Sequence, residues 1–203
     1  VFSRYVIDLN RPPDDAPMYP GASNTELCPT RFFTGDPLYK EGCQPDADEK
    51  LRRREIYWQP YHQALSGELS RLRLLHSNVL LWDAHSIRGE IPWLFDGKLP
   101  DLNVGTANGL AAAESVGLAV MEVCSQQEQF THVLNGRFKG GYITRCYGNP
   151  QGGIHAVQLE KCQSVYMNEL PPYEYKPELA AQVQPLLHKM VAAALNQVKS
   201  LSL

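Results

Sequence analysis

The chain has 203 residues, of which 43% are hydrophobic and 20% charged, a composition typical of a globular protein with a sizeable core. Its 19 Lys and Arg residues are outnumbered by 22 Asp and Glu residues, and the resulting net charge of −3 argues against a nucleic-acid partner. No apolar run reaches the roughly eighteen residues typical of a membrane-spanning helix. We therefore expect a single domain over residues 1–203, with neither a nucleic-acid nor a membrane partner.

The cysteines are odd in number and none of them forms a CxxC pair, so a disulfide framework and a zinc ribbon are both disfavoured. They are Cys28, Cys43, Cys124, Cys146 and Cys162. No basic segment followed by an apolar core marks a secretory signal at the start of the chain. These features predict free thiols in a reducing, cytoplasmic compartment.

The chain opens on a β-rich run, Val1–Asp8, with no methionine before it. A strand that starts at the first residue predicts entry in mid-fold, so we expect an upstream segment to be missing. The next stretch, Leu9–Asp48, is rich in proline and glycine and predicts a long irregular excursion with one short element near Thr30–Phe33. Such a loop is either functional or a plain surface insertion.

Three segments have the apolar spacing of helices. In the first, Asp46 resembles an N-cap, apolar residues recur at helical spacing to about His76, and Pro60 is expected to kink or split the helix. A second helix is predicted over Gly109–Gln126. A third is predicted over Pro177–Val198, with proline at its first position.

Short apolar runs between these helices predict strands. The runs are Asn78–Trp82, Asp101–Gly105, Thr131–Leu134 and Ile154–Glu160. Because strands alternate with long helices, the pattern indicates an α/β fold whose sheet is covered on both faces.

Asp83 and His85 follow the strand predicted over Asn78–Trp82, at its C-terminal end. Their spacing of two places both side chains on one face of an extended chain, and open α/β sheets bind ligands at this end of their strands. An imidazole there is a natural metal ligand that the carboxylate orients or joins. The alternative is a buried histidine hydrogen-bonded to its neighbours.

Glu160 ends the strand that begins near His155, and their odd separation predicts that the two side chains point to opposite faces. One of them can face the crevice as a ligand or a proton carrier. A single glutamate at a strand end more often has a structural role.

The segment Asn135–Arg145 combines glycines with Arg137 and Arg145. Glycine lets the backbone approach a ligand closely, and arginine forks bind carboxylates. Asn10 and Arg11 are a second candidate carboxylate clamp, and a solvated basic loop is the other interpretation. The chain contains no phosphate-loop pattern, no GxSxG elbow and no cysteine nucleophile motif.

Four motifs occur in order along the chain. They are Val6–Pro13 (VIDLNRPP), Trp82–Ser86 (WDAHS), Asn135–Arg145 (NGRFKGGYITR) and Val157–Glu160 (VQLE). Together they resemble the N-formylglutamate amidohydrolase family, and the resemblance runs essentially from end to end of the 203 residues.

The resemblance implies a zinc-carboxypeptidase-like fold, a three-layer αβα sandwich around a mixed sheet. It also implies hydrolysis of N-formyl-L-glutamate to L-glutamate and formate in histidine degradation. One zinc ion is implied, with His85 as a ligand and Asp83 as a further candidate ligand. The family motif that would supply a histidine and an acidic ligand has no counterpart here and would lie before Val1, so we expect an N-terminally truncated fold.

The reaction implied by this resemblance assigns further roles. A formamide is a poor electrophile, so its hydrolysis calls for a polarised carbonyl and an activated water, both of which a metal supplies. Glu160 is the candidate that carries the proton to the leaving amine. The substrate is a small dicarboxylate, for which Asn10, Arg11, Arg137 and Arg145 are the candidate binding residues.

Cys146 departs from the family pattern, which generally has histidine after Thr-Arg. One alternative to the deformylase is a catalytically incomplete fragment or relic, because a catalytic zinc normally takes three protein ligands and the resemblance matches only His85. Another is a related metallopeptidase-like hydrolase acting on N-acyl amino acids. The oligomeric state is not predicted by the sequence.

Overall fold

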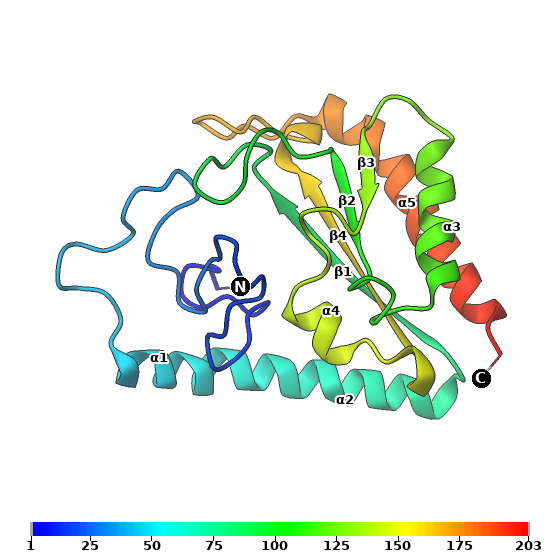
Figure 1. The fold of residues 1–203 in the computed structure, drawn as a ribbon, viewed down its shortest axis with the longest axis horizontal. Helices are drawn as coiled ribbons and strands as arrows, with labels where there is room; N and C mark the ends of the chain where they lie inside the picture. The colour runs from blue at the N-terminus through cyan, green and yellow to red at the C-terminus, as the bar shows by residue number, and fades with distance from the viewer. Residues whose placement is uncertain (1, 203) are drawn as a thin grey trace. The chain divides into compact units, whose positions relative to one another are not determined.

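The computed structural model describes residues 2–202, which form one mixed four-stranded sheet with helices on both of its faces (Figure 1). The strands follow the order β1-β4-β2-β3 across the sheet. They are β1 (Val79–Ile87), β2 (Leu102–Gly105), β3 (His132–Leu134) and β4 (Ile154–Cys162). The α/β class expected from the alternation of strands and helices is confirmed.

The pairing of the strands decides which side chains share a face. β1 is parallel to β4, whereas β2 is antiparallel to β4 and parallel to β3. Asp83 is paired with Gln158, and His85 is paired with Glu160, which is in turn paired with Asn103. Because paired residues project to the same side, these five residues lie on one face of the sheet.

The long helix near residue 46 begins as expected and does not break at the proline. Asp46 caps it by accepting a hydrogen bond from the backbone N–H of Glu49 (2.8 Å). Helix α1 (Ala47–Arg53) continues through a π-helical turn, η1 (Arg54–Trp58), into α2 (Gln59–Leu75). The π turn ends at Trp58, two residues before Pro60, which has no N–H group to donate to the preceding turn.

The remaining helices are α3 (Glu114–Ser125), α4 (Tyr142–Tyr147) and α5 (Pro177–Ser200), with short 3-10 turns η2 (Pro150–Gly152) and η3 (Gln163–Val165). Helices α3 and α5 pack side by side through buried apolar residues, among them Val120 and Met190 (Figure 1). Helix α3 begins five residues later than the Gly109 start expected from the sequence, and α4 occupies a segment expected to be a loop.

The described chain divides into two compact units. One contains the residues up to Ser70 together with Ile91–Gly97, and the other contains Arg71–Glu90 together with the residues from Lys98 onward. In the first unit the β-rich opening run is not a strand over its described residues, 2–8; it forms turns, one closed by the Val6 N–H on the Ser3 carbonyl (2.9 Å). The expected irregular excursion before α1 is observed.

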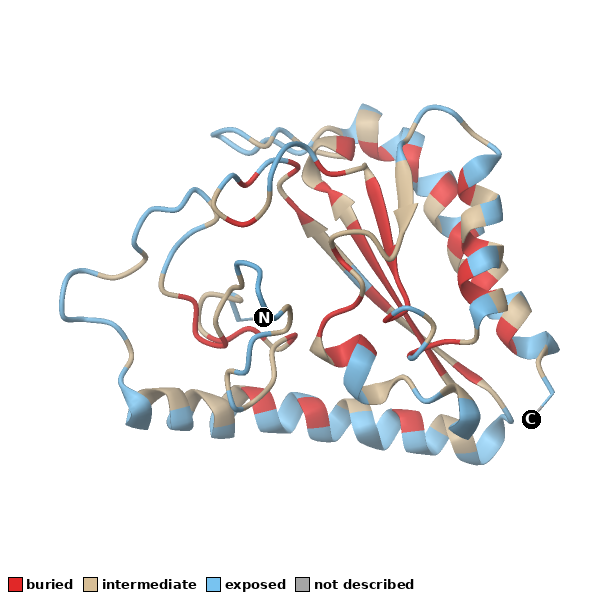
Figure 2. Cartoon of the chain, in the orientation of Figure 1, coloured by how far each residue is buried: buried red, intermediate tan, exposed pale blue. Residues whose placement is uncertain are grey.

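The sheet lies in the second unit, and its central strands are largely buried (Figure 2). All four residues of β2 are buried, as are most residues of β4. No helix formed by residues 2–202 is both long enough and apolar enough to cross a membrane. The buried strands β2 and β4 therefore carry part of the polar row formed by Asp83, His85, Asn103, Gln158 and Glu160.

Candidate active site

Asp83 and His85 lie within strand β1 and contact each other. The strand was expected to end at Trp82, but it continues to Ile87 because its last residues pair with β4. The His85 Nε2 atom is 2.7 Å from Asp83 Oδ1. The Asp83 side chain is only 9% exposed, whereas that of His85 is 26% exposed. A buried carboxylate therefore contacts a partly exposed imidazole.

Two further contacts fix this pair. On the same face, Thr144 of α4 is fully buried and its hydroxyl donates to Asp83 Oδ2 at 3.4 Å. From the opposite face, the Lys161 ammonium donates to the backbone carbonyl of His85 (3.2 Å). Burial lowers the pKa of Lys161, although the nearby Glu160 carboxylate counteracts this effect. The sequence interpretation missed Thr144, because nothing in its local pattern separates it from an ordinary helix residue.

Glu160 is buried and occupies the next position across the sheet from His85. Its backbone carbonyl accepts a hydrogen bond from Asn103 Nδ2 (3.1 Å), and the same amide group donates to the Pro100 carbonyl (2.7 Å). The fully buried Asn103 side chain thereby fixes β4 at the position of Glu160. Asn103 is a second residue that the sequence interpretation missed.

The glycine-rich segment 135–145 packs closely against the sheet. A Cβ atom at Gly105 of β2 would lie 2.6 Å from the backbone of Lys139 and Gly140, so only glycine allows this crossing. The buried Gln158 side chain accepts a hydrogen bond from the Gly141 N–H (2.6 Å). These contacts fix the start of α4 over the face that carries Asp83.

Arg145 and Arg137 both belong to the second unit. Arg145 lies on α4, and its Nε donates to the Gly140 carbonyl (2.9 Å) while the side chain lines a pocket. The Arg137 guanidinium lies 5.4 Å from the centre of the Phe138 ring, a cation–π contact. Their carboxylate-binding role stays a prediction.

Asn10 and Arg11 belong to the first unit, where Asp8 organises the segment. Asp8 Oδ1 accepts the Asn10 N–H (3.0 Å), and Arg4 pairs with Oδ2. Burial opposes ionisation of Asp8, but Arg4 and Arg11 hold its pKa below the usual value. The Arg11 guanidinium donates to the Thr25 carbonyl (3.1 Å) and hydroxyl and to the Asn10 carbonyl (2.8 Å). These bonds hold Arg11 in a fixed orientation.

His155 lies on the face of the sheet opposite the Asp83–His85 pair. As the odd spacing predicts, His155 points to the face opposite Glu160, where its Nδ1 accepts the Ala113 N–H (3.2 Å) at the start of α3. Burial lowers the pKa of His155, and Arg73 lowers it further. Cys146 is an exposed residue of α4. His155 is therefore a hydrogen-bonded core histidine.

The Asp83–His85 pair has the chemistry of part of a zinc site. An imidazole nitrogen and a carboxylate oxygen are both zinc ligands in proteins, and their 2.7 Å separation is that of a hydrogen bond, as expected of a carboxylate that orients a ligating imidazole. Among residues 2–202, no group of three His, Cys, Asp or Glu side chains is gathered for metal binding. The described residues thus fit one ligand of a catalytic zinc, His85, with Asp83 as the group that orients it.

Comparison with known proteins points to one family. A family model described as N-formylglutamate amidohydrolase matches residues 1–167. An N-formylglutamate deformylase of Pseudomonas putida is 52% identical over 194 residues, covering 96% of this chain and 72% of the relative. The deformylase of Pseudomonas aeruginosa is 47% identical over 194 residues, covering 96% of this chain and 73% of the relative.

Solved structures share the fold at lower identity. The N-formylglutamate amidohydrolase of Ralstonia eutropha superposes with a TM-score of 0.79 at 22% identity, covering 98% of this chain and 76% of that chain. A gene product of Agrobacterium tumefaciens gives a TM-score of 0.70 at 19% identity, covering 98% of this chain and 70% of its own. At these identities the likeness establishes the fold.

Proposed function

Because the chain belongs to the N-formylglutamate amidohydrolase family, we propose that it hydrolyses N-formyl-L-glutamate to L-glutamate and formate in a metal-dependent reaction. The observation that carries the proposal is the polar row on one sheet face, in which Asp83 contacts His85 and His85 is paired with Glu160. The proposal includes the role implied by the family resemblance, histidine degradation in the cytoplasm.

We assign zinc binding to His85, with Asp83 either as a second ligand or as the group that orients the imidazole. If His85 donates its Nε2 proton to Asp83, Nδ1 is the nitrogen that remains for the metal. A bound zinc ion would polarise the formyl carbonyl of the substrate and activate a water molecule. The buried carboxylate and the Thr144 hydroxyl behind it keep the imidazole in one orientation.

Glu160 is the proposed proton carrier. It neighbours His85 across the sheet, its side chain is buried, and its backbone is fixed by Asn103. In the proposed reaction it takes a proton from the attacking water and delivers it to the amide nitrogen as the C–N bond breaks. Because the nitrogen is protonated as it leaves, glutamate departs with a neutral amino group.

The arginines supply the charge that a dicarboxylate needs. Arg145 is oriented by its bond to Gly140 and lines a pocket on the same face as Asp83. We assign Arg137, Arg11 and Asn10 to the same task of carboxylate binding on the strength of the motifs they belong to.

The proposal is tested by formate release. The purified chain is supplied with zinc and given N-formyl-L-glutamate, N-acetyl-L-glutamate or N-formyl-L-alanine, before and after a chelator. We expect hydrolysis of the formyl dicarboxylate to exceed that of the other two, to cease on chelation and to return with zinc. Equal turnover of the acetyl compound would favour a general N-acyl amino acid hydrolase, and activity unaffected by the chelator would reject metal dependence.

A further inference from the structure

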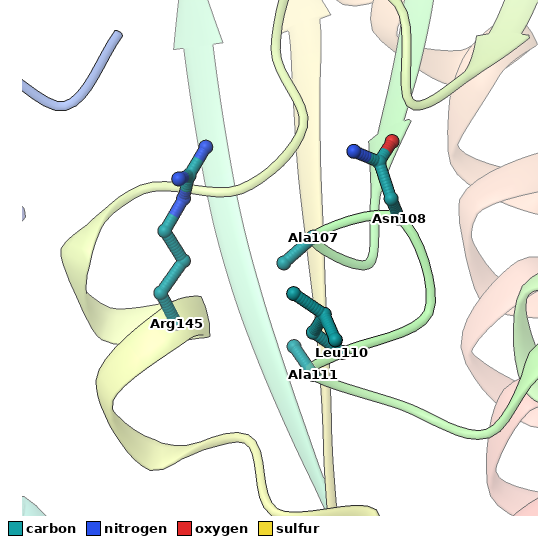
Figure 3. Close-up of a pocket in the computed structure, with 5 residues that line it drawn as sticks. All are labelled: Ala107, Asn108, Leu110, Ala111 and Arg145. Atoms are coloured by element: carbon teal, nitrogen blue, oxygen red, sulfur yellow. The ribbon is translucent and has the colours of Figure 1, made fainter. Parts of the chain in front are cut away.

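A cavity of about 210 Å³ opens beside helix α4 in the second unit. Its lining residues are Ala107, Asn108, Leu110, Ala111 and Arg145. Figure 3 shows Arg145 on one side and Asn108 on the other, with the alanines and the leucine between them. The cavity therefore combines one cation, one neutral amide and an apolar floor.

The cavity lies on the same face of the sheet as the Asp83–His85 pair. The Ala111 carbonyl accepts the Ala156 N–H (2.8 Å), and Ala107, Ala111 and Ala156 form one buried apolar cluster. Ala156 lies four positions before Glu160 on β4, which is roughly 13 Å along a strand, and Arg145 of α4 lines the cavity. The cavity and the candidate catalytic residues therefore share one face of the sheet.

The backbone holds Asn108 in a conformation that a non-glycine residue rarely adopts. Ala107 (φ +52°), Asn108 (φ +56°) and Gly109 (φ +86°) are three successive left-handed residues. The Asn135 side chain stabilises them, because its Oδ1 accepts the N–H groups of Thr106 (2.8 Å) and Asn108 (3.3 Å). Left-handed non-glycine residues are strained, so their surroundings must keep them in place.

We propose that Asn108 is a specificity residue that, together with Arg145, binds the side-chain carboxylate of N-formylglutamate. This inference rests on the proposed function. The guanidinium supplies two parallel N–H donors, the Asn108 amide supplies a third donor from the opposite side, and the alanine and leucine floor faces the two methylene groups. An amide suits this position because it donates to a carboxylate without adding a negative charge beside it.

Binding of glutarate, measured by isothermal titration calorimetry, tests the site without any need for turnover. Three variants are compared with the parent: Asn108→Gly, Asn108→Asp and Asn168→Asp. Glycine removes the amide and accepts the positive φ, so the loop is not strained. Asn168 is an exposed residue of the same unit and serves as the matched control for an added carboxylate.

We expect glutarate affinity to fall several-fold in Asn108→Gly and at least tenfold in Asn108→Asp, because the new carboxylate repels the ligand. Asn168→Asp should bind as the parent does, and neutral glutaramide should bind weakly to every variant. The inference is overturned if the parent does not bind glutarate, or if Asn108→Asp binds it with the parent's affinity.

A second measurement separates this inference from the proposed function. The ratio of kcat/KM for N-formyl-L-glutamate over N-formyl-L-glutamine should fall in Asn108→Asp, mainly through KM. If the parent binds glutarate through Asn108 but releases no formate, the proposed function fails and the site stands. If the parent is active and both Asn108 variants keep its ratio, the site fails and the proposed function stands.

Discussion

The His85 imidazole contacts the Asp83 carboxylate at 2.7 Å, and the two residues stand two positions apart on one strand. A carboxylate placed there fixes the orientation of the ring. Thr144 contacts the other carboxylate oxygen at 3.4 Å, so both oxygens of Asp83 have partners within the protein. The pair is therefore preorganised by residues of β1 and α4.

Replacement of Asp83 by asparagine should weaken both zinc binding and catalysis. The amide keeps the shape of the side chain but loses the charge that orients His85, and such partners typically contribute 10–100-fold to metal affinity or activity. Zinc titration and formate release would measure the two effects. The exposed Asp96 offers the control Asp96→Asn, which should change neither. Unchanged zinc affinity in Asp83→Asn would refute the orienting role.

Replacement of Glu160 by glutamine should remove the proton carrier with little change of shape. General acid–base catalysis contributes roughly 10²–10⁴-fold, so kcat should fall by about that factor while zinc content stays near that of the parent. Glu122→Gln, on the exposed surface of α3, should retain full turnover. If Glu160→Gln turned over within tenfold of the parent, another group would have to carry the proton.

Replacement of Gly105 by alanine should displace the Lys139–Gly140 crossing. The added Cβ would lie 2.6 Å from backbone atoms, which cannot move as freely as the end of a side chain. We expect a loss of about 1–3 kcal/mol in the free energy of unfolding, together with lower activity because α4 follows the crossing. Gly67→Ala in α2 has open space and should be neutral or stabilising by about 0.5–1 kcal/mol. Urea unfolding of both variants checks the contrast, and equal stabilities would contradict it.

Acidification should destabilise the fold through His155. Burial, assisted by Arg73, lowers the folded-state pKa below the ordinary value of 6.5, so the unfolded chain binds protons more readily than the folded chain. The contribution of neutral His155 to stability is therefore complete above about pH 6.5 and is lost as the pH falls below it. Urea unfolding at about pH 8 and pH 5.5 measures the difference.

Two variants assign this pH dependence. His155→Gln should reduce the difference in unfolding free energy between the two pH values, because glutamine does not titrate. His188→Gln, at an exposed position of α5, should leave it unchanged. Part of the dependence should persist in His155→Gln, since burial also lowers the pKa of His62. A full parental dependence in His155→Gln would show that His155 is not the responsible group.

The secondary structure shows which features local sequence patterns can predict. The strands near residues 102, 132 and 154, the N-cap at Asp46 and the helix from Pro177 were all predictable, because spacing, capping and proline position act over a few residues. The opening run was wrongly expected to be a strand, since its polar side chains bond to nearby backbone groups and favour turns.

The sequence alone determined the α/β class, the strand that carries Glu160 and, through four motifs, the family resemblance. Only the tertiary structure decided that β1 extends past Asp83 and His85, because that extension depends on pairing with β4, which lies more than seventy residues away. The left-handed turn at Asn108 was decided in the same way, by the side chain of Asn135, 27 residues further along. Local patterns predict elements, but hydrogen bonds between distant residues set where those elements end and which side chains meet.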